Sequence, residues 1–196
     1  MAKKQFSLEQ SLTKLRQIEV LMGAGVVSDL ATLAGKYLSK RDHSVASFSF
    51  SGGSLVVLGA NLRGIGPNQF EGPDGAIVTF SSSDGMMKVT VEVGGEIVFA
   101  GDRIEAVHVG DAVLAAYAGT YTSTELDATY KLSVENGSLM LRANWNRPVK
   151  LNPIVRDEFQ GGSFGNLVFH RDANNRISGL SVFAGRIRNV TFEKTN

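Results

Sequence analysis

Two short stretches of the sequence have the spacing of a serine nucleophile. Ser11 and Lys14 form an S-x-x-K arrangement, the acylating pair of one class of serine hydrolases. Ser163 stands in G-x-S-x-G, which presents a nucleophile only on a sharp turn between a strand and a helix. No Y-x-N, S-D-N or K-T-G motif completes the first site, and a strand-like run, residues 167–169, follows the second. We therefore predict no catalytic residue and a protein that is not an enzyme.

Metal and cofactor chemistry is equally poorly supported. The three histidines, His43, His108 and His170, lie in different segments without the spacing of metal ligands. Cysteine is absent, which excludes disulfides, thiolate nucleophiles and zinc sites that contain cysteine. We predict neither a metal site nor a cofactor.

Two pairs of residues are better suited to binding than to catalysis. Trp145 and Arg147 lie close together in a polar loop, where an aromatic ring and a cation can stack on or pair with a ligand. Arg186 and Arg188 alternate near the C-terminus and would share one face of a strand, where they could hold a carboxylate. These four residues are our candidate ligand-binding set. In the alternative interpretation, Trp145 covers a barrel end and the arginines are solvated surface charges.

Composition limits the classes of partner. The chain of 196 residues has 20 basic and 19 acidic side chains, so no global field attracts nucleic acid or an anionic membrane. No apolar run approaches the roughly 18 residues of a membrane span. Charged residues interrupt the apolar positions near the N-terminus, which argues against a secretory signal and predicts a cytoplasmic protein. We expect no nucleic-acid partner and no membrane partner.

One amphipathic helix is predicted, over residues 7–22. Ser7 and Gln10 have the spacing of a capping box, and Gly23 or Gly25 would end the helix. An apolar stripe follows at spacings of three and four residues: Leu8, Leu12, Leu15, Ile18 and Leu21. The stripe must be buried, either against the rest of the chain or against a second copy in a homodimer.

After the helix, short segments that alternate polar and apolar residues predict antiparallel strands joined by tight turns. Examples are residues 45–50, 87–93, 129–134 and 177–182. The 22 glycines of the chain, spread in small groups, indicate many tight turns. Strands at this spacing are typical of a barrel or a sandwich.

An internal repeat favours two small barrels over one large sheet. Residues 30–37 (LATLAGKY) align with 114–121 (LAAYAGTY), and residues 69–72 (QFEG) resemble 158–161 (EFQG). We therefore predict a helical arm over 1–27, a first antiparallel barrel over 28–111 and a second over 112–196, with about eight strands each. The interior should be filled by side chains, with recognition at loops or between the barrels. The predicted core residues are Phe48, Phe50, Leu55, Val57, Ile77, Phe80 and Val89 in the first barrel, and Tyr130, Leu132, Val134, Leu139, Leu141, Val168, Leu180, Val182 and Phe192 in the second.

Residues 114–121, 123–130 (STELDATY) and 184–192 (AGRIRNVTF) resemble a known module. It is the lipocalin-like domain that lies C-terminal to penicillin-binding-protein-type serine hydrolases, including D-aminopeptidases and class C β-lactamase relatives. The resemblance covers residues 112–196 well and 28–111 more weakly. It implies eight-stranded accessory barrels without a nucleophile, in relatives that carry a catalytic domain and can be exported. This sequence has no such catalytic domain before the barrels.

Residues 3–10 and 14–22 are similar to the start of the helix-turn-helix subunit of insertion-sequence transposases, without the helix that would read DNA. One hypothesis is therefore a fused reading frame. The predicted function is a non-catalytic accessory or binding module for a peptide, a small ligand or a protein partner. The alternative is a remnant or part of a serine hydrolase that acts on peptides or β-lactams.

Overall fold

The computed structural model describes residues 30–105, 107–143, 147–185 and 187–195. These residues are mainly β and divide into two compact units. The first unit holds the described residues up to Tyr37 and Ala46–Arg103, and the second holds Leu38–Val45 and the described residues of Ile104–Asn196. The helix predicted over residues 7–22 lies outside the described residues, and the predicted domain boundaries stay predictions.

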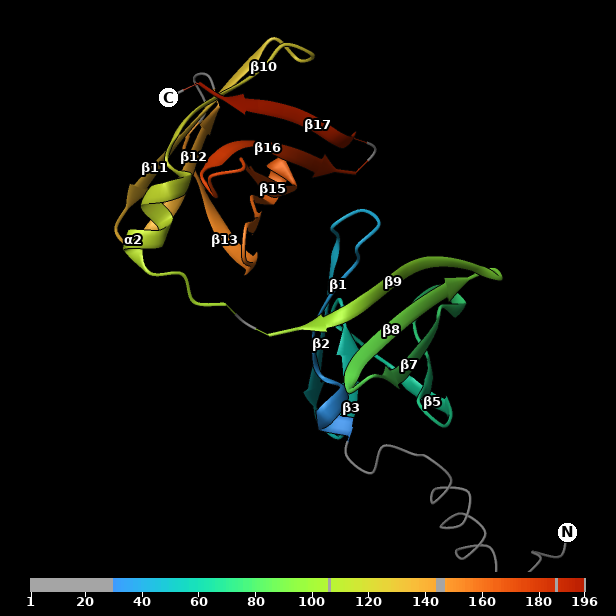
Figure 1. Cartoon of the computed structure of the whole chain (residues 1–196). Coiled ribbons are helices and arrows are strands. Elements are labelled where there is room, and N and C mark those ends of the chain that lie inside the picture. Colours follow the sequence, from blue (N-terminus) through green and yellow to red (C-terminus); the bar gives the residue numbers. More distant parts are fainter. Residues whose placement is uncertain (1–29, 106, 144–146, 186, 196) are drawn as a thin grey trace, which may run out of the picture. The chain divides into compact units, whose positions relative to one another are not determined.

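The first unit is a nine-stranded sheet that is nearly closed (Figure 1). Its strand order is β4-β3-β2-β1-β9-β8-β7-β6-β5. The two edge strands β4 and β5 are consecutive in the chain and are separated only by Leu62, so the chain itself bridges the gap. The elements are η1 (Leu30–Leu33), β1 (Gly35–Leu38), β2 (Val45–Ser51), β3 (Ser54–Val57), β4 (Ala60–Asn61), β5 (Arg63–Gly66), β6 (Gln69–Glu71), η2 (Pro73–Gly75), β7 (Ile77–Ser83), β8 (Met86–Val93) and β9 (Glu96–Ile104).

The second unit is a closed barrel of eight antiparallel strands in sequential order. The barrel closes where β10 pairs with β17, with Tyr121 opposite Lys194. Its elements are α2 (Asp111–Leu114), η3 (Ala115–Tyr117), β10 (Gly119–Ser123), β11 (Ala128–Glu135), β12 (Ser138–Ala143), β13 (Val149–Val155), β14 (Glu158–Gln160), η4 (Gly162–Phe164), β15 (Asn166–Arg171), β16 (Ile177–Ala184) and β17 (Ile187–Lys194).

Tight turns fix the register of the hairpins. Asn136 and Gly137, between β11 and β12, have φ angles of 49° and 69°. Asparagine and glycine tolerate this left-handed conformation, and its twist matches that of the strands on either side. The short-strand, tight-turn architecture expected from the sequence is therefore present in the described residues.

The two units repeat each other element by element. Gly64 pairs with Phe70 between β5 and β6, and Pro153 pairs with Phe159 between β13 and β14. The interrupted pair β4–β5 of the first unit thus corresponds to the continuous β13 of the barrel. The β5–β6 turn of the first unit and the β13–β14 turn of the second are held in the same way. The N–H of Phe80 donates to the carbonyl of Asn68, and the N–H of Phe169 donates to the carbonyl of Asp157.

Side chains fill the interior of each unit. In the closed barrel the rings of Tyr117, Tyr121 and Phe159 are at most 1% exposed. Most of the predicted core residues are buried, including Phe48, Leu55, Phe80 and Val89 in the first unit and Tyr130, Leu132, Leu139, Leu141, Leu180, Val182 and Phe192 in the second.

Three core predictions are wrong. Phe50, the second-last residue of β2, is 43% exposed although Leu55, its partner on β3, is buried. Val168 lies between the buried residues Leu167 and Phe169 and outside the core cluster. Strand alternation therefore places Val168 on the outer face of β15. Ile77 likewise precedes the buried Val78 and lies outside the core cluster of the first unit, so it faces outward in β7.

Candidate ligand site at the helix end of the closed barrel

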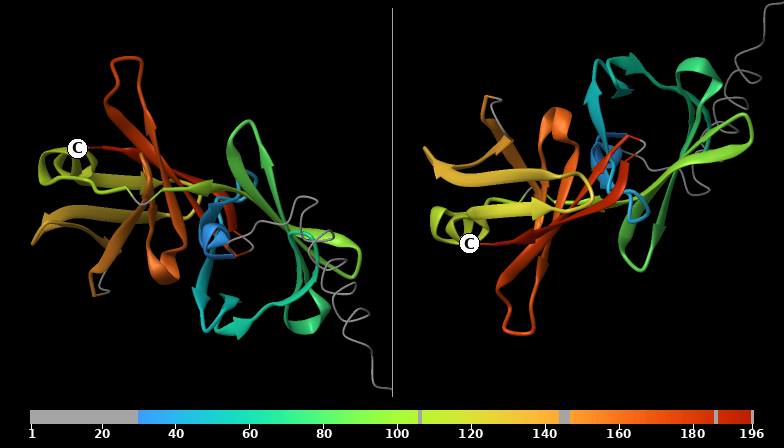
Figure 2. Two further views of the ribbon diagram at one scale, coloured as in Figure 1. Left: turned by 90° about the horizontal axis from the view of Figure 1, so that it is seen from below. Right: turned by 90° about the horizontal axis from the view of Figure 1, so that it is seen from above.

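The strand order assigns every connection of the barrel to one of two ends. Because the strands are antiparallel and sequential, the β11–β12, β13–β14 and β15–β16 turns share an end with η3 and with the last residues of β17. Lys194, the last residue of β17, donates to the carbonyl of Ala116 in η3, which agrees with the overlap of the C-terminal end of β17 and the short helix in Figure 2. We call this the helix end, and the end with the other four connections the opposite end.

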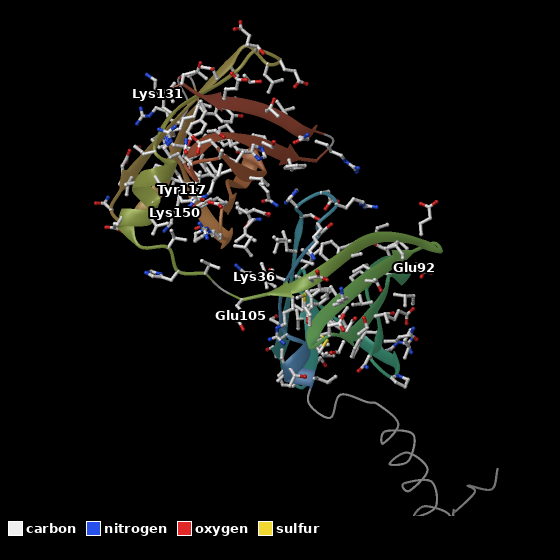
Figure 3. All side chains as sticks on the ribbon, in the orientation of Figure 1. Lys36, Glu92, Glu105, Tyr117, Lys131 and Lys150 are labelled. Carbon is white, nitrogen blue, oxygen red and sulfur yellow. The ribbon has the colours of Figure 1, made fainter. Side chains whose placement is uncertain are left out.

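A charged cluster lies at the helix end and is formed by Tyr117, Asp157 and Arg171. The Tyr117 hydroxyl donates to Oδ1 of Asp157 at 2.7 Å. Arg171 donates through Nη2 to Oδ1 at 2.7 Å and through Nε to Oδ2 at 3.0 Å, a two-pronged pairing that fixes both side chains. Its Nη1 donates to the carbonyl of Asn175 at 2.7 Å. Figure 3 shows Tyr117 beside helix α2.

Each partner changes the ionisation of the others. The hydrogen bonds from Arg171 lower the pKa of Asp157 below its ordinary value, against the opposing effect of burial. The same contact raises the pKa of Arg171. Burial, reinforced by the acceptor Asp157, raises the pKa of Tyr117. The cluster therefore holds a fixed carboxylate, a fixed guanidinium and a neutral phenol over a wide range of pH.

A pocket of about 460 Å³ adjoins this cluster at the helix end. Arg171 forms part of its wall, together with Ala116, Asp172, Asn175, Arg176, Ile177 and Lys194. Tyr117 is 1% exposed and is absent from this wall. The phenol therefore acts by holding Asp157 and Arg171 in place, rather than by touching a ligand.

The other two cations of the pocket are held by local contacts. Lys194 donates from Nζ to the carbonyl of Ala116 at 3.0 Å and lies 5.6 Å from the centre of the Tyr121 ring. Partial burial lowers its pKa. Arg176 donates from Nε to Oδ2 of Asp172 at 3.1 Å, and the backbone N–H of Arg176 donates to Oδ1 at 2.8 Å.

The equivalent positions of the first unit lack this cluster. Leu33 takes the place of Tyr117, Asn68 that of Asp157 and Ser82 that of Arg171. Lys194 does have a counterpart, since Arg103 donates from Nη1 to the carbonyl of Thr32 at 2.6 Å. The repeat therefore keeps the basic cap on the helical turn and confines the Tyr–Asp–Arg cluster to the closed barrel. The first unit has a smaller hollow of about 240 Å³, with Leu30, Leu55, Leu62 and Phe70 among its lining residues.

The ligand-binding set predicted from the sequence does not line the pocket. Trp145 and Arg186 lie outside the described residues. Arg147 is exposed between β12 and β13, and Arg188 is exposed near the start of β17. Both segments belong to the opposite end of the barrel, so the two described arginines share an end but are remote from the charged cluster.

The serine motifs also differ from a nucleophile site. Ser163 is exposed in the 3-10 turn η4 between two strands, rather than on a strand-to-helix turn, and Ser11 lies outside the described residues. A serine–histidine contact that the sequence does not reveal joins Oγ of Ser181 to Nε2 of His170 at 2.7 Å. Ser181 is 1% exposed, which keeps a substrate from its hydroxyl. Within the described ranges, no group of three His, Asp or Glu side chains could hold a metal ion.

The part of the chain that the structure describes contains no helix that is both long enough and apolar enough to cross a membrane. Compared with known proteins, the chain matches no protein-family model and no curated protein.

Proposed function

We propose that this protein is a non-catalytic, lipocalin-like accessory module that binds a small ligand at the helix end of its second barrel. The closed barrel of eight antiparallel strands agrees with the architecture that the resemblance implies. Its interior is filled, so a ligand has room at the ends of the barrel rather than inside it.

One observation carries the proposal: the two units share a scaffold, and only one of them has the charged cluster beside a pocket. A partly buried Asp–Arg pair costs desolvation energy that uncharged residues, such as Asn68 and Ser82 in the first unit, do not. The barrel nevertheless fixes Asp157 and Arg171 next to a pocket of about 460 Å³, which is in the size range of small-molecule sites. Fixed polar groups at the wall of a pocket are what orient a ligand.

The alternative, a serine hydrolase fragment, is supported by the G-x-S-x-G match and the His170–Ser181 contact. The turn around Ser163 and the burial of Ser181 both argue against turnover. Hydrolysis of nitrocefin or D-alanine p-nitroanilide by the full chain, abolished by Ser163→Ala or Ser181→Ala, would favour this alternative over our proposal.

A matched pair of variants tests the binding site. Ala116 is exposed and lines the pocket, so Ala116→Phe should fill it. Thr32 is the exposed equivalent in the first unit, and Thr32→Phe is the control. We expect benzoate or benzamide to bind the full chain in a saturation-transfer NMR experiment, to bind Thr32→Phe equally and to bind Ala116→Phe at least about tenfold more weakly. Equal binding by all three chains, or no binding by any, contradicts the proposal.

A further inference from the structure

We propose that the pocket at the helix end binds the anionic group of a small molecule, a carboxylate or a phosphate, through Lys194 and Arg176. This inference rests on the proposed function and names the chemical class of its ligand.

The lining of the pocket is electropositive. It contains three cations, Arg171, Arg176 and Lys194, and one carboxylate, Asp172, which gives a net charge of +2 for these side chains. The second carboxylate of this region, Asp157, lies outside the lining but compensates the charge of Arg171, so the region as a whole keeps a net charge of +1. A concave site with a net positive charge attracts anions.

The basic side chains of the pocket differ in how many of their N–H donors are already bonded within the protein. Arg171 donates to Asp157, which compensates its charge, and to the carbonyl of Asn175, so it is a fixed part of the wall rather than a donor to a ligand. Lys194 directs one bond to the carbonyl of Ala116, and an ammonium group carries three donors. Arg176 directs Nε and Nη2 toward Asp172, which leaves Nη1 for a ligand. Lys194 and Arg176 can therefore supply hydrogen bonds to an incoming anion.

The single carboxylate of the wall is occupied on both oxygens. Oδ1 of Asp172 accepts from the backbone N–H groups of Asn174 and Arg176, and Oδ2 accepts from the Arg176 side chain. Asp172 therefore orders the β15–β16 turn and holds Arg176 at the pocket, and a cationic ligand would have to break these bonds. The wall favours an anion over a cation.

The site matches a small molecule that has an apolar body as well as an anionic group. Ala116 and the buried Ile177 supply apolar surface in the same lining. A charged group held by two basic donors, with carbon packed on the adjacent surface, is the common pattern of small-ligand recognition.

Lys194 and Arg176 could instead have a purely structural role, and comparison with the first unit distinguishes the two roles. The bond from Lys194 to the helical turn is repeated in the first unit by Arg103, so this cap alone implies no ligand. Arg176 has no basic counterpart, because the position before β8 in the first unit is Gly85. Substitution of Arg176 should therefore weaken ligand binding without unfolding the protein, which distinguishes a binding role from a structural one.

The test uses the full chain and four probes that share a phenyl ring: benzoate, phenyl phosphate, neutral benzamide and cationic benzylamine. We expect benzoate or phenyl phosphate to bind at least about tenfold more tightly than benzamide, and benzylamine to bind most weakly. The stronger of the two anions distinguishes a carboxylate ligand from a phosphate ligand. Arg176→Gln and Lys194→Gln should each weaken anion binding at least about fivefold. Arg188→Gln, at the opposite end, is the control and should leave binding unchanged.

Three outcomes overturn the inference. If benzamide binds as tightly as both anions and Ala116→Phe still abolishes binding, the pocket is a ligand site but has no preference for anions. Anion binding that is lost in Arg188→Gln and kept in Arg176→Gln moves the site to the opposite end. The absence of binding by all four probes contradicts both this inference and the proposed function. Circular dichroism and the midpoint of thermal unfolding show whether each variant is folded.

Discussion

The hydroxyl of Tyr121 donates to the backbone carbonyl of Tyr117, four residues earlier, at 2.7 Å. Tyr37 makes the same bond to Leu33 at 2.8 Å in the first unit. Each tyrosine lies in the first strand of its unit and is fully buried, so each bond ties that strand to the helical turn before it. This contact is common to both units, whereas Asp157 and Arg171 are present only in the closed barrel.

Removing either hydroxyl should destabilise its unit by a similar amount. Tyr121→Phe and Tyr37→Phe each leave a buried carbonyl without its donor, and we expect a loss of about 1–3 kcal/mol in the free energy of unfolding. Urea titration followed by circular dichroism measures the loss. Tyr130→Phe is the control, because Tyr130 is also buried but has no hydrogen-bond partner among the described residues, and it should change the stability by less than about 0.5 kcal/mol.

The Asp157–Arg171 pair should behave as a coupled unit. Asp157→Asn introduces the residue that the first unit has, and it leaves Arg171 without a carboxylate in a site where both side chains are about one-fifth exposed. We expect a loss of about 1–3 kcal/mol. Arg171→Ser, the other residue of the first unit, should cost a similar amount alone but add little to Asp157→Asn. Strictly additive losses in the double variant would show that the two side chains are independent.

Acid should remove the contribution of Asp157. The pKa of Asp157 is lowered in the folded protein, chiefly by hydrogen bonds from Arg171, whereas an unfolded aspartate titrates near pH 4. The contribution is therefore complete above about pH 4 and is lost as the pH falls through the lower, folded value. The stability difference between wild type and Asp157→Asn should stay constant from pH 7 to 5 and shrink below pH 4. A difference that does not change down to pH 3 would contradict this assignment.

The tyrosines should resist ionisation as long as the protein is folded. Burial is the largest cause of a raised pKa at each of the four tyrosines, Tyr37, Tyr117, Tyr121 and Tyr130. A raised folded pKa stabilises the protein below the unfolded value near pH 10, and this contribution is lost as the pH rises toward the folded value. Phenolate absorbance at 295 nm should therefore rise in one step together with unfolding. A smooth titration near pH 10 without unfolding would show that the rings are accessible.

The sequence predicts the scaffold better than it predicts the site. Alternation and turn residues are local signals, and the repeated tyrosine at positions 37 and 121 marks equivalent strands, so the β architecture follows from the sequence. Phe50, Ile77 and Val168 were assigned wrongly because alternation alone shows neither how exposed a residue near a strand end is nor which of two adjacent apolar residues faces inward.

The charged cluster has no sequence motif. Tyr117, Asp157 and Arg171 come from a helical turn, a hairpin turn and a strand end, and only closure of the barrel brings them together. A signal was nevertheless present in the repeat, where the equivalent residues are Leu33, Asn68 and Ser82. Positions at which two copies of one scaffold differ in chemical type indicate where one copy has acquired a separate role.

The most direct test of a ligand site confined to one end of the closed barrel is a map of backbone amide chemical shifts in the full chain during titration with benzoate. The predicted result is saturable shifts at Arg171, Arg176 and Lys194, with none at the first unit's equivalents, Ser82, Gly85 and Arg103. Shifts at both sets of residues, or shifts centred on Arg147 and Arg188 at the opposite end, would contradict the account.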